Sequence, residues 1–234
     1  MSIRQTTHYA KRSMALLNQL RFFQRSTSVS FTRSIYLHRG PRVEGLKKDP
    51  QEVFINHNGI EYELNQNNIQ HIKSYLGDKF QIPDEIALQI ITHKSFGNGI
   101  KPYNEKLATM GSKLLSLFAA KHAINKPTEK DAKLVINGKN LSILGSPKAK
   151  ELHGRKSTGY FAKLNGLNKT MFWKSRNPTL NFESSGELKV SSQMLYSLIG
   201  AVNIYHGKAK AEEFINDNLI KGLEEITDEL VHRG

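Results

Sequence analysis

The sequence predicts an all-α fold for residues 65–228 of the 234-residue chain. Apolar side chains recur there at three- and four-residue spacing, as on one face of an amphipathic helix. Gly, Pro and Asn separate these segments, and such residues start and stop helices. Strand-like patterning is limited to EVFIN and IEYEL, which flank the turn-forming HNG at residues 57–59. These pieces predict at most a short hairpin ahead of the helices.

The composition is that of a globular protein, with 38% hydrophobic and 24% charged residues. No apolar run approaches the ~18 residues that a membrane-spanning helix needs, so membrane insertion is not expected. The chain has no cysteine. Disulfides, thiolate zinc sites and cysteine nucleophiles are therefore excluded.

The formal charge of +13 suggests a polyanionic partner and is concentrated at the start of the chain. Residues 1–43 contain eight Lys and Arg and no acid. Residues 1–34 are also Ser-rich and carry an amphipathic apolar stripe, which predicts a mitochondrial transit peptide and a matrix location. The alternative is a basic disordered arm that stays on the protein and binds nucleic acid. Residues 35–64 are interpreted as a basic extension or linker.

The helices are expected in a definite order. Residues 65–80 have Asn caps and a stop at Gly77, and residues 83–96 begin with Pro83 and two acids, which suit a first turn. A helix from about residue 104 to Asn125 follows, and residues 128–154 would supply two more, with breaks near residues 145–147 and Gly154. Residues 190–230 predict a buried helix, a break at Gly207 and an amphipathic terminal helix.

The helix that begins with NEKLATMGSKLL presents two faces. Glu105, Ala108 and Ser112 share one face, where acids could converge on an ion, yet only Glu105 is acidic. The apolar face, expected in the core, holds Leu107, Met110, Leu114, Leu115 and Phe118.

Three motifs, in order, resemble those of the ribonuclease III endonuclease domain. ALQIITHKSF resembles the family's A-L-T-H-R-S-[YF], and NEKLATMGSKLL resembles N-E-R-L-E-F-L-G-D-x-V-L. SSQMLYSLIGAVNIYHG resembles A-D-x-x-E-A-L-I-G-A-x-Y-L-D-G. The resemblance covers most of residues 65–222 and implies a helical domain of this family. It also implies a mechanism in which carboxylates of two helices hold Mg²⁺ for cleavage of an RNA phosphodiester.

The resemblance places neutral residues where the family has its four principal metal carboxylates. Those positions hold Ala108, Ser112, Gln193 and Tyr196. Glu105 alone cannot organise a hard dication, which needs several anionic oxygens. Asp131, Glu183 and Glu187 do not fall on the ion-facing side of the two helices. The expectation is a non-catalytic protein without metal or cofactor.

Cations near the motifs are candidates for RNA contact. Lys106 and Lys113 could touch phosphates directly or be ordinary solvated helix residues. In KTMFWKSR, residues 169–176, the aromatics suit base stacking between cations, or they anchor the core. His93 is expected to be a structural histidine, since no nucleophile or acid partner is in sight. The RNA-binding candidates are Lys106, Lys113, Arg155, Lys156, Lys169, Trp173, Lys174 and Arg176.

The resemblance also bears on partners. The family's enzymes usually carry a double-stranded RNA-binding domain after the nuclease domain, and the few residues after Gly222 are too short for one. In the family an aromatic side chain at this position inserts into the partner subunit, and here the position holds Thr109. A symmetric dimer of this chain would lack that buried aromatic contact. A heterodimer with a second ribonuclease III-like chain is therefore expected.

The combination of missing acids, missing RNA-binding domain and transit-like start is similar to the non-catalytic ribonuclease III-like chains of fungal mitochondrial large ribosomal subunits. It implies a structural scaffold bound to mitochondrial large-subunit rRNA, to a second ribonuclease III-like subunit and to other large-subunit proteins. Two alternatives remain open: an active mitochondrial Mg²⁺-dependent endoribonuclease with unconventional ligands, and a transient ribosome assembly factor.

Overall fold

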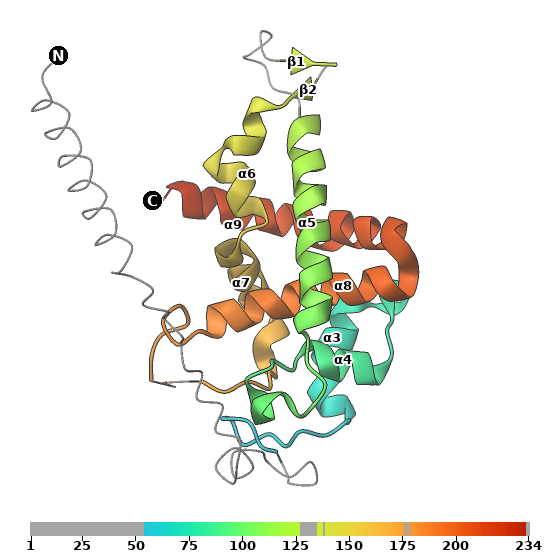
Figure 1. Cartoon of the computed structure of the whole chain (residues 1–234), viewed down its shortest axis with the longest axis vertical. Helices are drawn as coiled ribbons and strands as arrows, with labels where there is room; N and C mark the ends of the chain where they lie inside the picture. Colours follow the sequence, from blue (N-terminus) through green and yellow to red (C-terminus); the bar gives the residue numbers. More distant parts are fainter. Residues whose placement is uncertain (1–53, 127–134, 138, 176, 178, 233–234) are drawn as a thin grey trace, which may run out of the picture. The chain divides into compact units, whose positions relative to one another are not determined.

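Helix α5, Glu105–Asn125, crosses helix α8, Glu187–Phe214, and the remaining helices pack around this crossing (Figure 1). The computed structural model describes residues 54–126, 135–137, 139–175, 177 and 179–232. The expected transit peptide and most of the basic extension lie outside these residues. The predicted all-α fold class is confirmed. The other α-helices are α3 Gln66–Leu76, α4 Asp84–Ile90, α6 Pro147–Leu152, α7 Arg155–Leu164 and α9 Ile220–His232.

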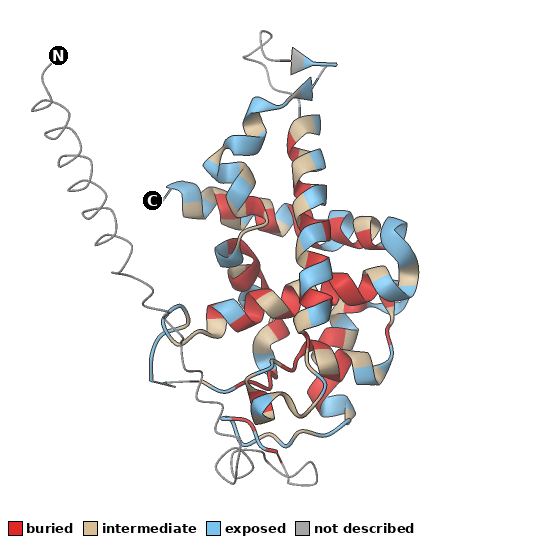
Figure 2. Ribbon diagram, viewed as in Figure 1, coloured by how far each residue is buried: buried red, intermediate tan, exposed pale blue. Residues whose placement is uncertain are grey.

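Two glycines let the backbones of α5 and α8 touch. A Cβ atom added at Gly111 would lie 1.8 Å from the carbonyl oxygen of Tyr196. One added at Gly200 would lie 2.1 Å from the carbonyl oxygen of Leu107. Any side chain at either position would therefore force the helices apart. Figure 2 shows buried residues concentrated where α5, α7 and α8 meet.

The expected apolar face of α5 is confirmed with one correction. Leu107, Leu114 and Leu115 are buried, and Phe118 packs partly buried against the core. Met110, in contrast, is 43% exposed. Its sulfur lies 3.1 Å from Nδ2 of Asn203 on α8, at the edge of the helix crossing and outside the core.

Helix α4 is shorter than the sequence predicts and ends at Ile90 instead of near residue 96. After Ile90 the chain pairs in parallel with a distant segment through the bridge between Thr92 and Phe172. The amide of His93 donates to the carbonyl of Phe172 at 2.8 Å, and the amide of Phe172 donates to Ile91 at 2.9 Å. These tertiary hydrogen bonds replace the helical ones. The chain then forms the 3₁₀ helix η2, Phe96–Gly99.

Two helices were expected within residues 128–154, and the prediction of the first one is wrong for the residues that the structure describes. There the chain forms strands β1, Val135–Ile136, and β2, Lys139–Asn140, followed by the 3₁₀ helix η4, Ser142–Gly145. Asn137 has φ +51°, which suits a tight hairpin turn of the Asn-Gly type. The predicted breaks at residues 145–147 and Gly154 are confirmed, with α6 between them. Helix α7, Arg155–Leu164, was not predicted.

The C-terminal half of the prediction is confirmed. Gly207 interrupts α8 with φ +82° and ψ 168°, values that L side chains rarely adopt. A π-helical segment, Ile215–Leu219, joins α8 to the amphipathic α9. At the other end, one antiparallel bridge between Ile55 and Glu61 forms the expected hairpin. Among the described residues no helix is long and apolar enough to span a membrane.

Replacing Gly111 with Ala should lower the free energy of unfolding by at least ~2 kcal/mol, because the new methyl group overlaps the backbone of α8. Urea denaturation followed by circular dichroism measures the loss. Gly145→Ala is the matched control, since a Cβ at Gly145 meets open space. A Gly111→Ala protein within ~0.5 kcal/mol of the original would show that the helices do not depend on this contact.

Candidate nucleic-acid interface

A cleft of about 260 Å³ opens at the side of the helix crossing. Helix α5 contributes Ala108 and Ser112, and α8 contributes Gln193 and Tyr196. These are the four positions that the sequence comparison with the nuclease motifs singled out, and the fold brings them together. The other lining residues are Glu105, Thr109, Arg155, Lys189 and Ser192.

The cleft has a single acid. Glu105 is paired with Lys94, whose Nζ lies 2.6 Å from the carboxylate, and both side chains are substantially exposed. Nowhere in the described part of the chain do three His, Asp or Glu side chains gather as a metal site would require. Apart from the Glu105 carboxylate, the cleft offers hydroxyls and an amide and is flanked by cations, a poor match for a hard dication.

Gln193 and Tyr196 bond to their own chain. Gln193 Nε2 donates to Asn104 Oδ1 at 3.0 Å, and the buried Asn104 in turn donates to the carbonyl of Ile90 at 2.8 Å. The Tyr196 hydroxyl donates to the carbonyl of His153 at 2.9 Å and accepts from Thr158 Oγ1 at 3.2 Å. Both side chains thus tie α8 to neighbouring segments, and their polar atoms are already engaged.

Arg155 and Lys189 make the cleft basic. Arg155 begins α7 and Lys189 lies in the first turn of α8, and both are exposed. Neither has an acidic partner within 4.0 Å among the residues that the structure describes. The pKa of nearby His93 is lowered, first by burial and then by the positive charges of Lys189 and Lys94. His93 Nδ1 lies 2.8 Å from Ser95 Oγ, as expected of a structural residue.

Lys189 was missed in the sequence. It lies four residues before Gln193, so the spacing on α8 puts both on one helix face. A search for cations at i−4 from the motif position would have found it.

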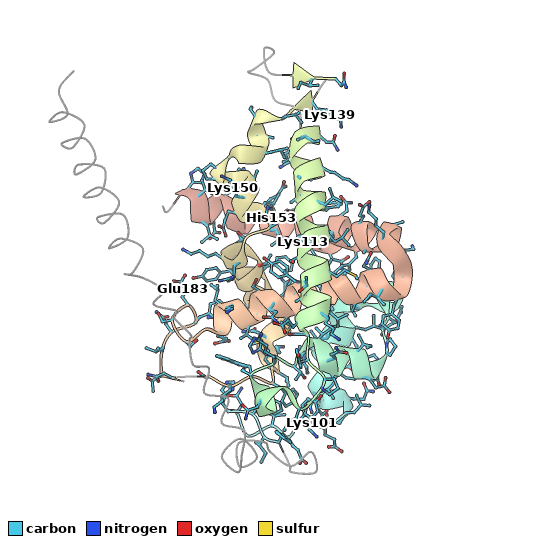
Figure 3. All side chains as sticks on the ribbon, in the orientation of Figure 1. Lys101, Lys113, Lys139, Lys150, His153 and Glu183 are labelled. Atoms are coloured by element: carbon cyan, nitrogen blue, oxygen red, sulfur yellow. The ribbon has the colours of Figure 1, made fainter. Side chains whose placement is uncertain are left out.

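The sequence-predicted RNA-binding residues lie in several places. Arg155 alone lines the cleft. Lys106 and Lys113 are exposed on α5 outside the lining (Figure 3 labels Lys113), and Lys169 is exposed on the 3₁₀ helix η5, Leu167–Lys169. Lys156 lines a different hollow, beside Pro147 and Leu230. Arg176 lies outside the described residues.

Trp173 and Lys174 line a second hollow, which shares no lining residue with the cleft. Trp173 is only 6% exposed, so most of the indole lies in the core, and its contact with RNA stays a prediction. The indole packs edge-on against His57, with ring centroids 5.7 Å apart, and belongs to the core. Phe172 is fully buried, as its alternative role of core anchor requires.

Comparisons with known proteins show what the chain is similar to. A family model described as ribonuclease-III-like matches residues 83–223. The chain is 26% identical to large ribosomal subunit protein mL57 of Schizosaccharomyces pombe over 180 residues, 74% of this chain and 79% of the relative. It is 25% identical to mL57 of Neurospora crassa over 156 residues, 63% of this chain. That match spans 58% of the Neurospora protein's length.

A solved structure is also similar. The nuclease domain of ribonuclease III from Campylobacter jejuni aligns with 68% of this chain and 98% of its own, at 22% identity and a TM-score of 0.46.

Replacing Tyr196 with Phe should lower the free energy of unfolding by about 1 kcal/mol, because the hydroxyl's bond to His153 is lost and the buried Thr158 keeps fewer partners. Chemical denaturation measures the difference. Tyr205→Phe on the same helix is the control, since Tyr205 is 46% exposed. Equal stability of the two variants would contradict a structural role for the Tyr196 hydroxyl.

Proposed function

The chain belongs to the ribonuclease-III-like family, and from this premise we propose that it is a non-catalytic structural component of the mitochondrial large ribosomal subunit. In this role it holds large-subunit rRNA and pairs with a second ribonuclease III-like chain. The names of the Schizosaccharomyces and Neurospora relatives support a place in a large ribosomal subunit. The Arg- and Ser-rich, acid-free start of the sequence supports import into mitochondria.

The composition of the cleft carries the proposal. Where the family motifs have metal-binding carboxylates, this chain has a methyl group, a hydroxyl, an amide and a phenol, at Ala108, Ser112, Gln193 and Tyr196. Hydrolysis of a phosphodiester by a metal-activated water needs several anionic oxygens to hold the metal. The lack of these carboxylates argues against cleavage of RNA. It also favours the approach of an anion, because fewer negative charges repel it.

Arg155 and Lys189 are suited to hold that anion. A guanidinium can bind a phosphate with two parallel hydrogen bonds, and an ammonium adds a point charge beside it. Because neither cation is committed to an acidic partner in the described chain, no ion pair has to be broken when a phosphate arrives. An RNA backbone phosphate therefore fits the cleft in the place of a metal.

Helix α5 offers a surface for the second chain. Lys106, Met110, Lys113 and Leu117 follow one another at four- and three-residue spacing, so they lie on one helix face. Met110 and Leu117 are 43% and 46% exposed. Apolar side chains on an exposed helix face are typical of an interface. The two lysines in this stripe are accordingly assigned to the partner protein and not to RNA.

The competing functions differ in what they require. An active endoribonuclease would have to gather new metal ligands, and Glu105 is the only carboxylate that lines the cleft. A transient assembly factor would use the same contacts as a scaffold but would leave the mature particle. Occupancy of the mature subunit is therefore the property that separates the last two.

The double variant Arg155→Gln/Lys189→Gln should bind duplex RNA about tenfold more weakly at low salt, and its log–log salt dependence should flatten by about one to two units. Fluorescence anisotropy with labelled duplex RNA measures both. Lys221→Gln, an exposed lysine of α9, is the control for loss of charge alone. Cleavage of the duplex by the original protein in Mg²⁺ would overturn the non-catalytic assignment.

In the cell, the tagged full-length chain should co-sediment with mature large ribosomal subunits in a sucrose gradient, at about one copy per particle, as expected for a stably bound interface. High-salt washing of the particles should retain it, because a scaffold is held by protein contacts as well as by phosphates. Presence in precursor particles only would assign the chain to assembly. If the chain were absent from all ribosomal fractions, the proposed function would be wrong.

A further inference from the structure

The second hollow is a pocket of about 340 Å³, large enough for a small ligand. We call it the Trp173 pocket. Phe54 and Phe96 form an apolar wall, with ring centroids 5.8 Å apart, and His57 and Trp173 lie edge to face. The pocket is thus flanked by aromatic rings contributed by segments that are distant in the sequence.

Two polar groups at this pocket lack partners. Trp173 Nε1 and Ser175 Oγ are buried and have no hydrogen-bond partner in the described chain. Buried N–H and hydroxyl groups without a partner are rare in proteins, because each costs about 1–3 kcal/mol of desolvation. Both side chains line the cavity, but the two atoms themselves are covered, so a small side-chain movement would have to expose them to an acceptor that enters it.

The remaining polar groups of the lining point to the same ligand chemistry. Both polar atoms of the Asn56 side chain already have hydrogen-bond partners. Its Oδ1 accepts from the amides of Asn58 and Ile60, and its Nδ2 donates to the carbonyl of Met171. Ser95 Oγ already accepts the amide of Lys174 at 3.0 Å. No acid lines the pocket, and the exposed Lys174 adds a positive charge.

A nucleotide satisfies these requirements better than a peptide. A nucleobase carries acceptor atoms along its edge and a flat face for aromatic contact, and its phosphate matches Lys174. A peptide main chain brings one N–H donor per residue, whereas the two unpartnered groups of the lining are themselves donors. A base inside a duplex cannot enter, so the ligand must be unpaired.

We infer that the Trp173 pocket receives an unpaired nucleotide of RNA, with an acceptor on the base engaging Trp173 Nε1 or Ser175 Oγ and the phosphate contacting Lys174. The inference rests on the proposed function in assuming that RNA is the partner. It names a second, separate contact that reads an extruded base, whereas the cleft holds backbone phosphate.

Trp173 is the only tryptophan of the chain, so its fluorescence reports on this pocket directly. The full-length protein is titrated with short single-stranded oligo(A) or oligo(U) and with a blunt-ended duplex. The single strands should change the tryptophan emission saturably, and the duplex should not. Lys174→Gln/Ser175→Ala should raise the midpoint of the oligo(A) or oligo(U) curve about tenfold, which is the loss expected for two polar contacts.

Lys150→Gln, an exposed lysine of α6 labelled in Figure 3, is the matched control and should leave the midpoint unchanged. Circular dichroism checks that each variant is folded. Constant tryptophan emission while labelled single-stranded RNA binds by anisotropy would overturn the inference. So would emission that responds to a peptide of residues 35–53 and not to RNA, since that result assigns the pocket to the chain's own upstream segment.

These outcomes are separable from those of the proposed function. Arg155→Gln/Lys189→Gln should weaken duplex binding and leave the oligo(A) midpoint in the Trp173 pocket unchanged. A protein that co-sediments with mature subunits but shows no tryptophan response would keep its role as a scaffold and lose the nucleotide pocket.

Discussion

The backbone contact between α5 and α8 at Gly111 and Gly200 is the constraint on which the rest of the structure depends. Because no Cβ separates the helices there, side chains within two turns of the two glycines face each other across a narrow gap. Ala108 and Ser112 on α5 thereby come opposite Gln193 and Tyr196 on α8. A larger distance between α5 and α8 would separate these side chains, and they would no longer line one cleft. The site is thus a consequence of helix packing and needs no loop to build it.

Within this fixed frame, the side chains at the cleft decide its chemistry. Carboxylates at these positions would repel one another unless a dication joined them. Gln193 and Tyr196 instead find partners within the protein, at Asn104 and His153. In the described part of the chain, Glu105 is the one acid that lines the cleft, and Lys94 already holds it. Neutral side chains at these four positions therefore leave the cleft with a surplus of positive charge from Arg155 and Lys189.

The sequence predicted what depends on neighbours along the chain. The period of α5, the break at Gly207 and the caps of α3 are local, and the cleft positions followed from motif spacing on two helices. The β1–β2 hairpin and helix α7 are local structures that the sequence pattern did not reveal. Other failures depend on distant contacts. Helix α4 ends early because the chain pairs with Phe172, and the Trp173 indole is buried because His57 and other core residues cover it. The residue pattern of one segment does not show which distant segment it will contact.

Holding a strand and cutting it place different demands on the same cleft. In metal-dependent cleavage, negative charge develops on the leaving oxygen as water attacks the phosphate. A metal must activate that water and stabilise that charge. A scaffold needs fixed positive charges that bind a phosphate, and the guanidinium of Arg155 is one of the two cations that line the cleft. Two groups near the cleft could take a proton, Glu105 and His93, and they are paired with Lys94 and with Ser95. The combination of cations and neutral side chains therefore favours holding a strand over cutting it, as the proposed function requires.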